Sequence, residues 1–140
     1  MELKIKLEEG AVLPTKKTDG AACYDCYAYL KKPVIIWPFQ TKAIPLGIRT
    51  EFEEGYYLEV RGRSGNSLHG LQTIIGTVDS DYRGIIGGIT HNGSIFPKKV
   101  KPNDRIAQFV MKEIIPSEIK VVNDLSETKR GEGGFGSTGK

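Results

Sequence analysis

Two carboxylates, a phenol and a guanidinium are crowded into one short stretch, Gly76 to Gly84, which reads GTVDSDYRG. Apolar β-type residues precede and follow this stretch, so it is predicted to be a hairpin end that presents side chains to a ligand. Asp79 and Asp81 are two residues apart and would share one face of an extended strand, with Tyr82 on the other. Taken alone, the stretch is explained as well by a solvated turn.

A second candidate segment is basic and rich in glycine and serine. Residues 61–67 read RGRSGNS, and their guanidinium and backbone N–H groups could hold an anion, although taken alone the segment favours a basic surface turn. Two further polar residues interrupt β-type stretches. Asp25 lies in a tyrosine-rich stretch, and Gln108 shares a face with Ile106 and Val110. A buried polar side chain needs a partner, which a ligand could supply.

The C-terminal residues 130–140 differ in composition from everything before them. They read RGEGGFGSTGK, with five glycines and one aromatic residue, Phe135. Such a segment cannot form a core, so it is predicted to be a flexible arm whose N–H groups could wrap phosphates. Residues 134–140 also resemble most of a P-loop. No Ser or Thr follows the lysine and no helix can start there, so this interpretation is rejected.

The two cysteines form a C-x-x-C pair, Cys23 and Cys26. A zinc site would need two more ligands, and His69 and His91 do not have zinc-finger spacing. The residues around the pair favour an extended chain, whereas a thioredoxin-type motif opens a helix. Both cysteines are therefore predicted to be reduced and structural.

The composition indicates one ordinary domain. A length of 140 residues is enough for one domain with a core. The fractions of hydrophobic residues, 39%, and charged residues, 26%, are ordinary for a globular protein. No apolar run is long enough to span a membrane, and residues 1–4 show no signal-peptide pattern. We therefore expect a cytoplasmic protein, in the host cytoplasm if a virus encodes it. The net charge of +3 suits a small anionic ligand, and we expect neither a nucleic acid nor a membrane partner.

Short β-type segments separated by glycine and proline run through the whole chain. The predicted strands are residues 2–8, 21–30, 43–52, 56–60, 84–90, 105–111 and 114–122. Pro45 and Gly47 predict an edge or a bulge within the third of these. A helical turn is indicated only for residues 66–68. The pattern predicts an all-β sandwich or barrel.

Together, five segments resemble the five ordered motifs of the trimeric deoxyuridine triphosphate nucleotidohydrolase (dUTPase) family. In order, they are Ala21–Cys26, Gly62–Gly65, Gly76–Gly84, Asp104–Gln108 and Arg130–Gly139. The third and fifth motifs are the most specific, and the set spans nearly the whole chain. The chain departs from the family at Cys23 and Cys26, where Gly and Leu are usual, and at residues 66–67, where Leu-Ala is usual. The segment between Ser64 and Asp79 is also somewhat short.

The resemblance implies an all-β, jelly-roll-like domain over residues 1–129, followed by an arm, 130–140, that closes over a neighbouring subunit's active site. It implies a homotrimer in which each active site draws on three chains. The implied reaction is hydrolysis of dUTP to dUMP and pyrophosphate by Mg²⁺-assisted attack of water on the α-phosphorus. This dUTP diphosphatase reaction keeps uracil out of DNA and supplies dUMP for dTMP synthesis. An additional regulatory protein partner is compatible with the sequence.

The resemblance also implies roles for individual residues. Asp79 would hold and deprotonate the attacking water and also accept a hydrogen bond from the deoxyribose 3′-OH, and Asp25 would hold Mg²⁺ through its water shell. Tyr82 would lie under the deoxyribose and leave no room for a ribose 2′-OH. The other implied substrate contacts are Arg63, Ser64, Gly65 and Gln108 at the phosphates, the backbone of Thr73, Gly76 and Val78 in the 71–79 hairpin at uracil, and Arg130, Phe135, Gly136, Ser137 and Thr138 in the arm. Asp81, Arg83 and Arg105 are expected to be structural.

Two alternatives share this fold. dCTP deaminases carry a Pro-Gly pair after their catalytic acid and lack the arm, whereas here Ser80 and Asp81 follow Asp79. A non-enzymatic relative would be expected to have lost Asp79, Tyr82 or the arm, and the chain retains all three. The sequence therefore favours dUTP hydrolysis.

Overall fold

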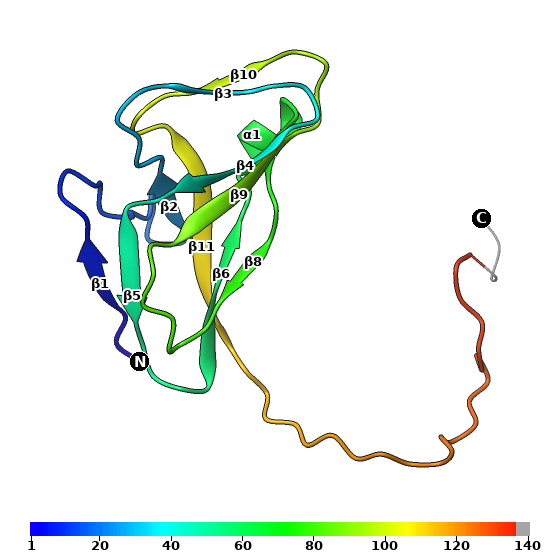
Figure 1. The fold of residues 1–140 in the computed structure, drawn as a ribbon. Coiled ribbons are helices and arrows are strands. Elements are labelled where there is room, and N and C mark those ends of the chain that lie inside the picture. The colour runs from blue at the N-terminus through cyan, green and yellow to red at the C-terminus, as the bar shows by residue number, and fades with distance from the viewer. Residues whose placement is uncertain (137–140) are drawn as a thin grey trace.

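The computed structural model describes residues 1–136, in which short strands alternate with tight turns (Figure 1). The strands are β1 (Lys4–Leu7), β2 (Tyr24–Tyr27), β3 (Val34–Ile36), β4 (Thr41–Pro45), β5 (Ile48–Glu51), β6 (Tyr56–Arg61), β7 (Leu71–Thr73), β8 (Gly76–Val78), β9 (Gly87–Asn92), β10 (Lys98–Val100) and β11 (Arg105–Glu113). The helix α1 spans Ser64–Leu68. No helix in this part of the chain is long and apolar enough to cross a membrane.

The strands form two larger antiparallel sheets and two ribbons. One sheet has the order β2-β11-β6-β8 and the other β4-β9-β7, while β1 pairs with β5 and β3 pairs with β10. Strand β11 is central to the first sheet because it pairs with β2 on one side and with β6 on the other. The prediction of an all-β fold is confirmed.

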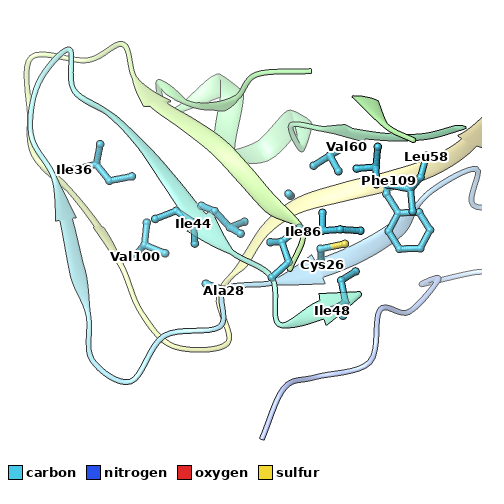
Figure 2. Close-up of a cluster of buried hydrophobic side chains, with 14 of the residues drawn as sticks. Cys26, Ala28, Ile36, Ile44, Ile48, Leu58, Val60, Ile86, Val100 and Phe109 are labelled. Carbon is cyan, nitrogen blue, oxygen red and sulfur yellow. The ribbon is translucent and has the colours of Figure 1, made fainter. Parts of the chain in front are cut away.

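Buried apolar side chains from these strands form one core (Figure 2). Leu58 and Val60 alternate inward along β6, as the period of a strand requires. Phe109 of β11 is fully buried and stacks on Tyr24, with ring centroids 5.1 Å apart. Burying a side chain of this size stabilises the fold by about 1.5–3 kcal/mol. The core therefore fixes β6 together with β2 and β11, and the latter two strands carry the first and fourth motifs.

The two cysteines have different environments, and both are free thiols. Cys26 points into the core beside Ile86 and Ile48 (Figure 2), and this burial raises the pKa of its thiol to about 12. Cys23 is only partly buried. The core position of Cys26 fits the predicted structural role.

The predicted strand 43–52 is divided into β4 and β5 at Gly47. This glycine has φ +67°, and a Cβ there would collide with Ala11 and Tyr29. The backbone thus turns where L side chains fit poorly. At the interruption expected from Pro45 and Gly47, the chain leaves the β4-β9-β7 sheet and enters the ribbon that β5 forms with β1.

The two predicted hairpins, 71–79 and 76–84, are wrong. Strand β7 pairs with β9, whereas β8 pairs with β6, so residues 74–75 carry the chain from one sheet to the other. Likewise, β8 and β9 do not pair with each other. Alternation along a strand shows which side chains share a face, but it does not identify the neighbouring strand.

Two further expectations need correction. A register shift between Arg105 and Ala107 buries both Ile106 and Ala107, so Gln108 does not share a simple face with Ile106. The predicted strand 114–122 is absent. The N–H of Ile114 donates to Gly55, and beyond it the chain extends away from the sheets (Figure 1). A β-type sequence forms no strand where the chain offers no partner strand.

Candidate active site

Asp25 lies at the centre of a polar cluster built from three segments. Its strand β2 pairs with β11, which places Asp25 directly opposite Gln108. Arg63, at the start of α1, donates from Nε to Asp25 Oδ1 at 2.8 Å, and Arg105 Nη1 lies 3.4 Å from Oδ2. The Asp25 side chain is only 14% exposed. The two guanidinium groups therefore compensate a carboxylate that is largely removed from water.

An open cavity of about 360 Å³, here named the Asp25 cavity, lies beside this cluster. It is lined by Lys17, Ala21, Ala22, Cys23, Asp25, Arg63, Ser64, Gly65 and Gln108. A Cβ at Gly65 would meet nothing within 4 Å, so this position leaves room for a ligand. Gln108 Nε2 donates to the Gly62 carbonyl at 2.8 Å, so its amide has an internal partner. Cations, hydroxyl and N–H groups around such a cavity suit phosphate oxygens.

A second cavity of about 240 Å³, here named the Asp79 cavity, lies at the opposite edge of the same sheet. It is lined by Val60, Gly76, Thr77, Val78, Asp79, Tyr82, Ile85, Ile86, Gly87 and Ile89. Its walls are largely apolar, and Asp79 and Tyr82 are its acid and its aromatic ring. Because β8 is an edge strand, backbone groups on its free side can bind a ligand as a neighbouring strand would. This combination suits a flat polar base and a sugar.

The ring of Tyr82 is held by local contacts. Its hydroxyl donates to the Ile85 carbonyl at 3.2 Å, and its N–H donates to Asp79. A Cβ at Gly84 would collide with this ring, which explains the glycine that ends the third motif. The loop thus fixes an aromatic ring within three residues of the candidate base.

Arg83 and two residues outside every motif, Arg49 and Glu8, hold the loop 79–84. Arg83 Nη1 donates to the carbonyls of Ser80 and Tyr82, at 2.6 and 3.1 Å. Arg49 donates to the Arg83 carbonyl at 2.9 Å and is itself paired with Glu8 at 2.6 Å. Neither Glu8 nor Arg49 was identified from the sequence. The partners are 41 residues apart, and no local pattern connects them.

The structure places the predicted residues in two groups that do not meet within one chain. Asp25 lies on β2 and Asp79 follows β8, at opposite edges of the four-stranded sheet. The two edges are three strand spacings apart, which is about 14 Å across the sheet. The pairing register also displaces Asp79 from Asp25 by about 13 Å along the strand direction. Asp25 and Asp79 of one chain therefore cannot contact the same phosphate group.

The remaining predicted contacts lie outside these two groups or beyond the described residues. The Thr73 side chain is buried and its hydroxyl donates to the Ile106 carbonyl at 3.0 Å, which leaves only its backbone for a ligand. Arg130 donates to Gly133 within a local turn, and Phe135 and Gly136 are exposed at the end of the extended segment. Ser137 and Thr138 lie outside the described residues.

The donor set near Asp25 bears on the expected Mg²⁺ ion. Within residues 1–136, no three His, Cys, Asp or Glu side chains gather into a group that could hold a metal. Asp25 is a single carboxylate beside a cavity suited to phosphate oxygens. Mg²⁺ commonly takes most of its ligands from water and substrate phosphates and few from protein, so these residues fit an ion held through water by Asp25.

Fold and cavities together define a jelly-roll-like protein in which an acid-and-arginine cluster borders a cavity that suits a small anionic ligand. A family model for dUTPase matches residues 9–139. The chain belongs to the dUTPase family, which confirms the resemblance found in the five motifs.

Relatives and solved structures extend this match over nearly the whole chain. A deoxyuridine 5′-triphosphate nucleotidohydrolase of Treponema denticola is 44% identical, with 99% of each chain covered. Another, from Nautilia profundicola, is 43% identical with 100% of each chain covered. The structure of a Staphylococcus bacteriophage 80alpha dUTPase with dUpNHpp is similar at a TM-score of 0.89, with 25% identity and 99% of each chain covered.

Proposed function

We infer that this protein is a dUTP diphosphatase, which hydrolyses dUTP to dUMP and pyrophosphate. The observation that carries this conclusion is full-length similarity, at 43–44% identity, to proteins named for that activity. The two cavities support it, because one suits phosphates and the other suits a base and a sugar.

The reaction needs a positioned water and neutralisation of charge on the phosphates, with little covalent help from the protein. Asp79 accepts the proton of the water that attacks the α-phosphorus. Arg63, Ser64, Gly65 and Gln108 bind phosphate oxygens in the Asp25 cavity. Asp25 would hold Mg²⁺ through its water shell, and the ion would supply positive charge that screens the triphosphate.

Selectivity for the nucleoside arises in the Asp79 cavity. The free edge of β8, including the backbone of Gly76 and Val78, pairs with the polar edge of uracil. Cytosine presents the reverse pattern of donors and acceptors and would leave buried groups unpaired, which discriminates strongly. Tyr82 packs under the deoxyribose, and its held ring leaves no space for a 2′-OH.

A homotrimer is supported by the separation of the two cavities within one chain. If each active site combines the Asp25 cavity of one subunit with the Asp79 cavity of another, the separation disappears. The segment after β11 also exposes apolar residues without partners of their own, with Ile115, Ile119 and Val121 86–93% exposed. Such side chains are usually buried against another chain. The arm 130–140 then supplies Arg130, Phe135, Gly136, Ser137 and Thr138 to a third subunit's site.

The test is direct. The purified protein is incubated with Mg²⁺ and dUTP, dCTP or UTP, and dUMP, pyrophosphate and ammonia are measured, alongside the molecular mass in solution. We expect pyrophosphate from dUTP alone, no ammonia, and a mass three times the 15.4 kDa of one chain. Ammonia from dCTP, or no hydrolysis of dUTP, would contradict the proposal. Cytoplasmic location and a further regulatory partner remain predictions from the sequence.

A further inference from the structure

We propose that Lys17 is a substrate-binding residue that contacts the outer phosphates of dUTP and the pyrophosphate product. This inference rests on the proposed function and adds a residue that belongs to none of the five motifs. Its structural basis is the loop before β2, which is bonded to Asp25 and places Lys17 at the Asp25 cavity.

The loop is attached by a short antiparallel bridge between Thr15 and Asp25. The Asp25 N–H donates to the Thr15 carbonyl at 2.8 Å, and the Thr15 N–H donates back at 3.3 Å. The Thr15 hydroxyl also lies 2.9 Å from the hydroxyl of Tyr27. Three residues later the chain turns, since Ala21 N–H donates to Thr18. Lys17 is thus two residues from an anchor on Asp25.

The neighbouring lysines face different surroundings. Lys16 Nζ lies 4.9 Å from the centroid of the Tyr24 ring, a cation–π contact outside the Asp25 cavity. Lys17 lines that cavity together with Arg63 and Ser64. The pair therefore provides one lysine at the candidate site and one matched lysine away from it.

The charges of the cavity favour an anion near Lys17. Its charged lining residues are Lys17, Arg63 and Asp25. Arg63 is already paired with Asp25, whereas none of the ion pairs found in residues 1–136 involves Lys17. The ammonium of Lys17 is consequently available to a ligand. A lysine acts on phosphate as a mobile point charge, so close preorganisation is unnecessary.

The position of the cavity indicates which phosphates are involved. Asp79 acts at the α-phosphorus in the proposed reaction, and the Asp25 cavity forms the other part of the active site. The phosphates further from the nucleoside therefore occupy the Asp25 cavity. Lys17 should accordingly strengthen binding of ligands that carry those phosphates and leave dUMP binding unchanged.

The experiment compares full-length wild-type protein with Lys17→Gln, Lys17→Arg and the matched control Lys16→Gln. Dissociation constants for dUpNHpp, pyrophosphate and dUMP are measured in Mg²⁺ buffer, together with kcat and KM for dUTP. Loss of one charge-assisted contact at an exposed site should weaken dUpNHpp and pyrophosphate binding about three- to tenfold. Lys17→Arg should restore most of this loss, and the effect should shrink at high salt.

In Lys17→Gln the KM should rise with kcat nearly unchanged, while dUMP affinity and the melting temperature stay at wild-type values. The inference is overturned if Lys17→Gln behaves like Lys16→Gln, or if dUMP binding weakens as much as dUpNHpp binding. Failure of the proposed function would instead appear in the wild-type protein, as absence of dUTP hydrolysis.

Discussion

Asp25 and Asp79 can be tested as members of one active site formed by two different chains. We take two variants, Asp25→Asn and Asp79→Asn, each of which keeps the size of the side chain it replaces. Removing the general base should lower turnover about 10²–10⁴-fold, and loss of the Asp25 charge should also impair it severely. Each variant alone is therefore expected to be nearly inactive.

A mixture of the two variants should regain activity. In one chain the two residues lie at opposite edges of a sheet, roughly 20 Å apart by strand spacing and register. A site shared by neighbouring subunits needs an intact Asp25 from one chain and an intact Asp79 from the next. In an equal mixture each condition holds for half of the chains, so about one quarter of the sites are intact.

The assay mixes the variants under conditions that allow subunits to exchange, and it measures pyrophosphate release before and after. Exchange is verified separately by native mass spectrometry with one variant carrying a tag. Recovery of about one quarter of wild-type turnover is expected, with unchanged KM. If exchange is complete and the mixture remains as inactive as its components, both residues act within one chain and the reasoning from the sheet geometry is wrong.

Three other outcomes follow from contacts already described. Gly84→Ala should displace the ring of Tyr82 and lower the ratio of kcat/KM for dUTP over UTP, which steady-state kinetics with both nucleotides will measure. Deletion of residues 130–140 should leave the melting temperature and the oligomeric mass unchanged, because residues 130–136, the part that the structure describes, add no buried core, but it should reduce turnover steeply. Because burial raises the pKa of Cys26 to about 12, its reactive thiolate is scarce below that pH. Iodoacetamide at pH 8, followed by mass spectrometry, should modify Cys23 first.

Each of these has a result that would count against it. An unchanged dUTP/UTP ratio in Gly84→Ala would mean that the ring position does not set sugar selectivity. Full activity after the deletion would make the arm dispensable. Modification of Cys26 as fast as Cys23 in the folded protein would show that its burial does not protect it. Gly20→Ala serves as a control for the glycine substitution, since a Cβ there meets nothing within 4 Å.

The sequence was sufficient for the strand-rich fold and the family, since both depend on local patterns. Alternation identifies strands such as β6, and the motif of Asp79 and Tyr82 is continuous in the chain. It could not identify strand neighbours, because pairing joins segments far apart. For this reason residues 71–79 were wrongly predicted to be a hairpin, although β7 and β8 belong to different sheets.

The supporting contacts of the site were also beyond local reasoning. Glu8, Arg49 and Arg83 come from three separate segments, and only the folded chain brings them together. In the sequence, Lys17 is one of two consecutive lysines, and no local pattern distinguishes it from Lys16. The Thr15–Asp25 bridge and the contact of Lys16 with Tyr24 distinguish the two lysines.

The exposed segment after β11 bears on how the protein behaves as its concentration changes. Ile115, Ile119, Val121 and Leu125 are all more than four-fifths exposed in the single chain. Burying four such side chains on a neighbour would contribute about 6–12 kcal/mol per subunit before the cost of ordering the segment. Much of the free energy that keeps each domain folded would then come from association, so the midpoint of thermal unfolding should rise as the protein is concentrated. Dilution would weaken the fold and the shared active site together.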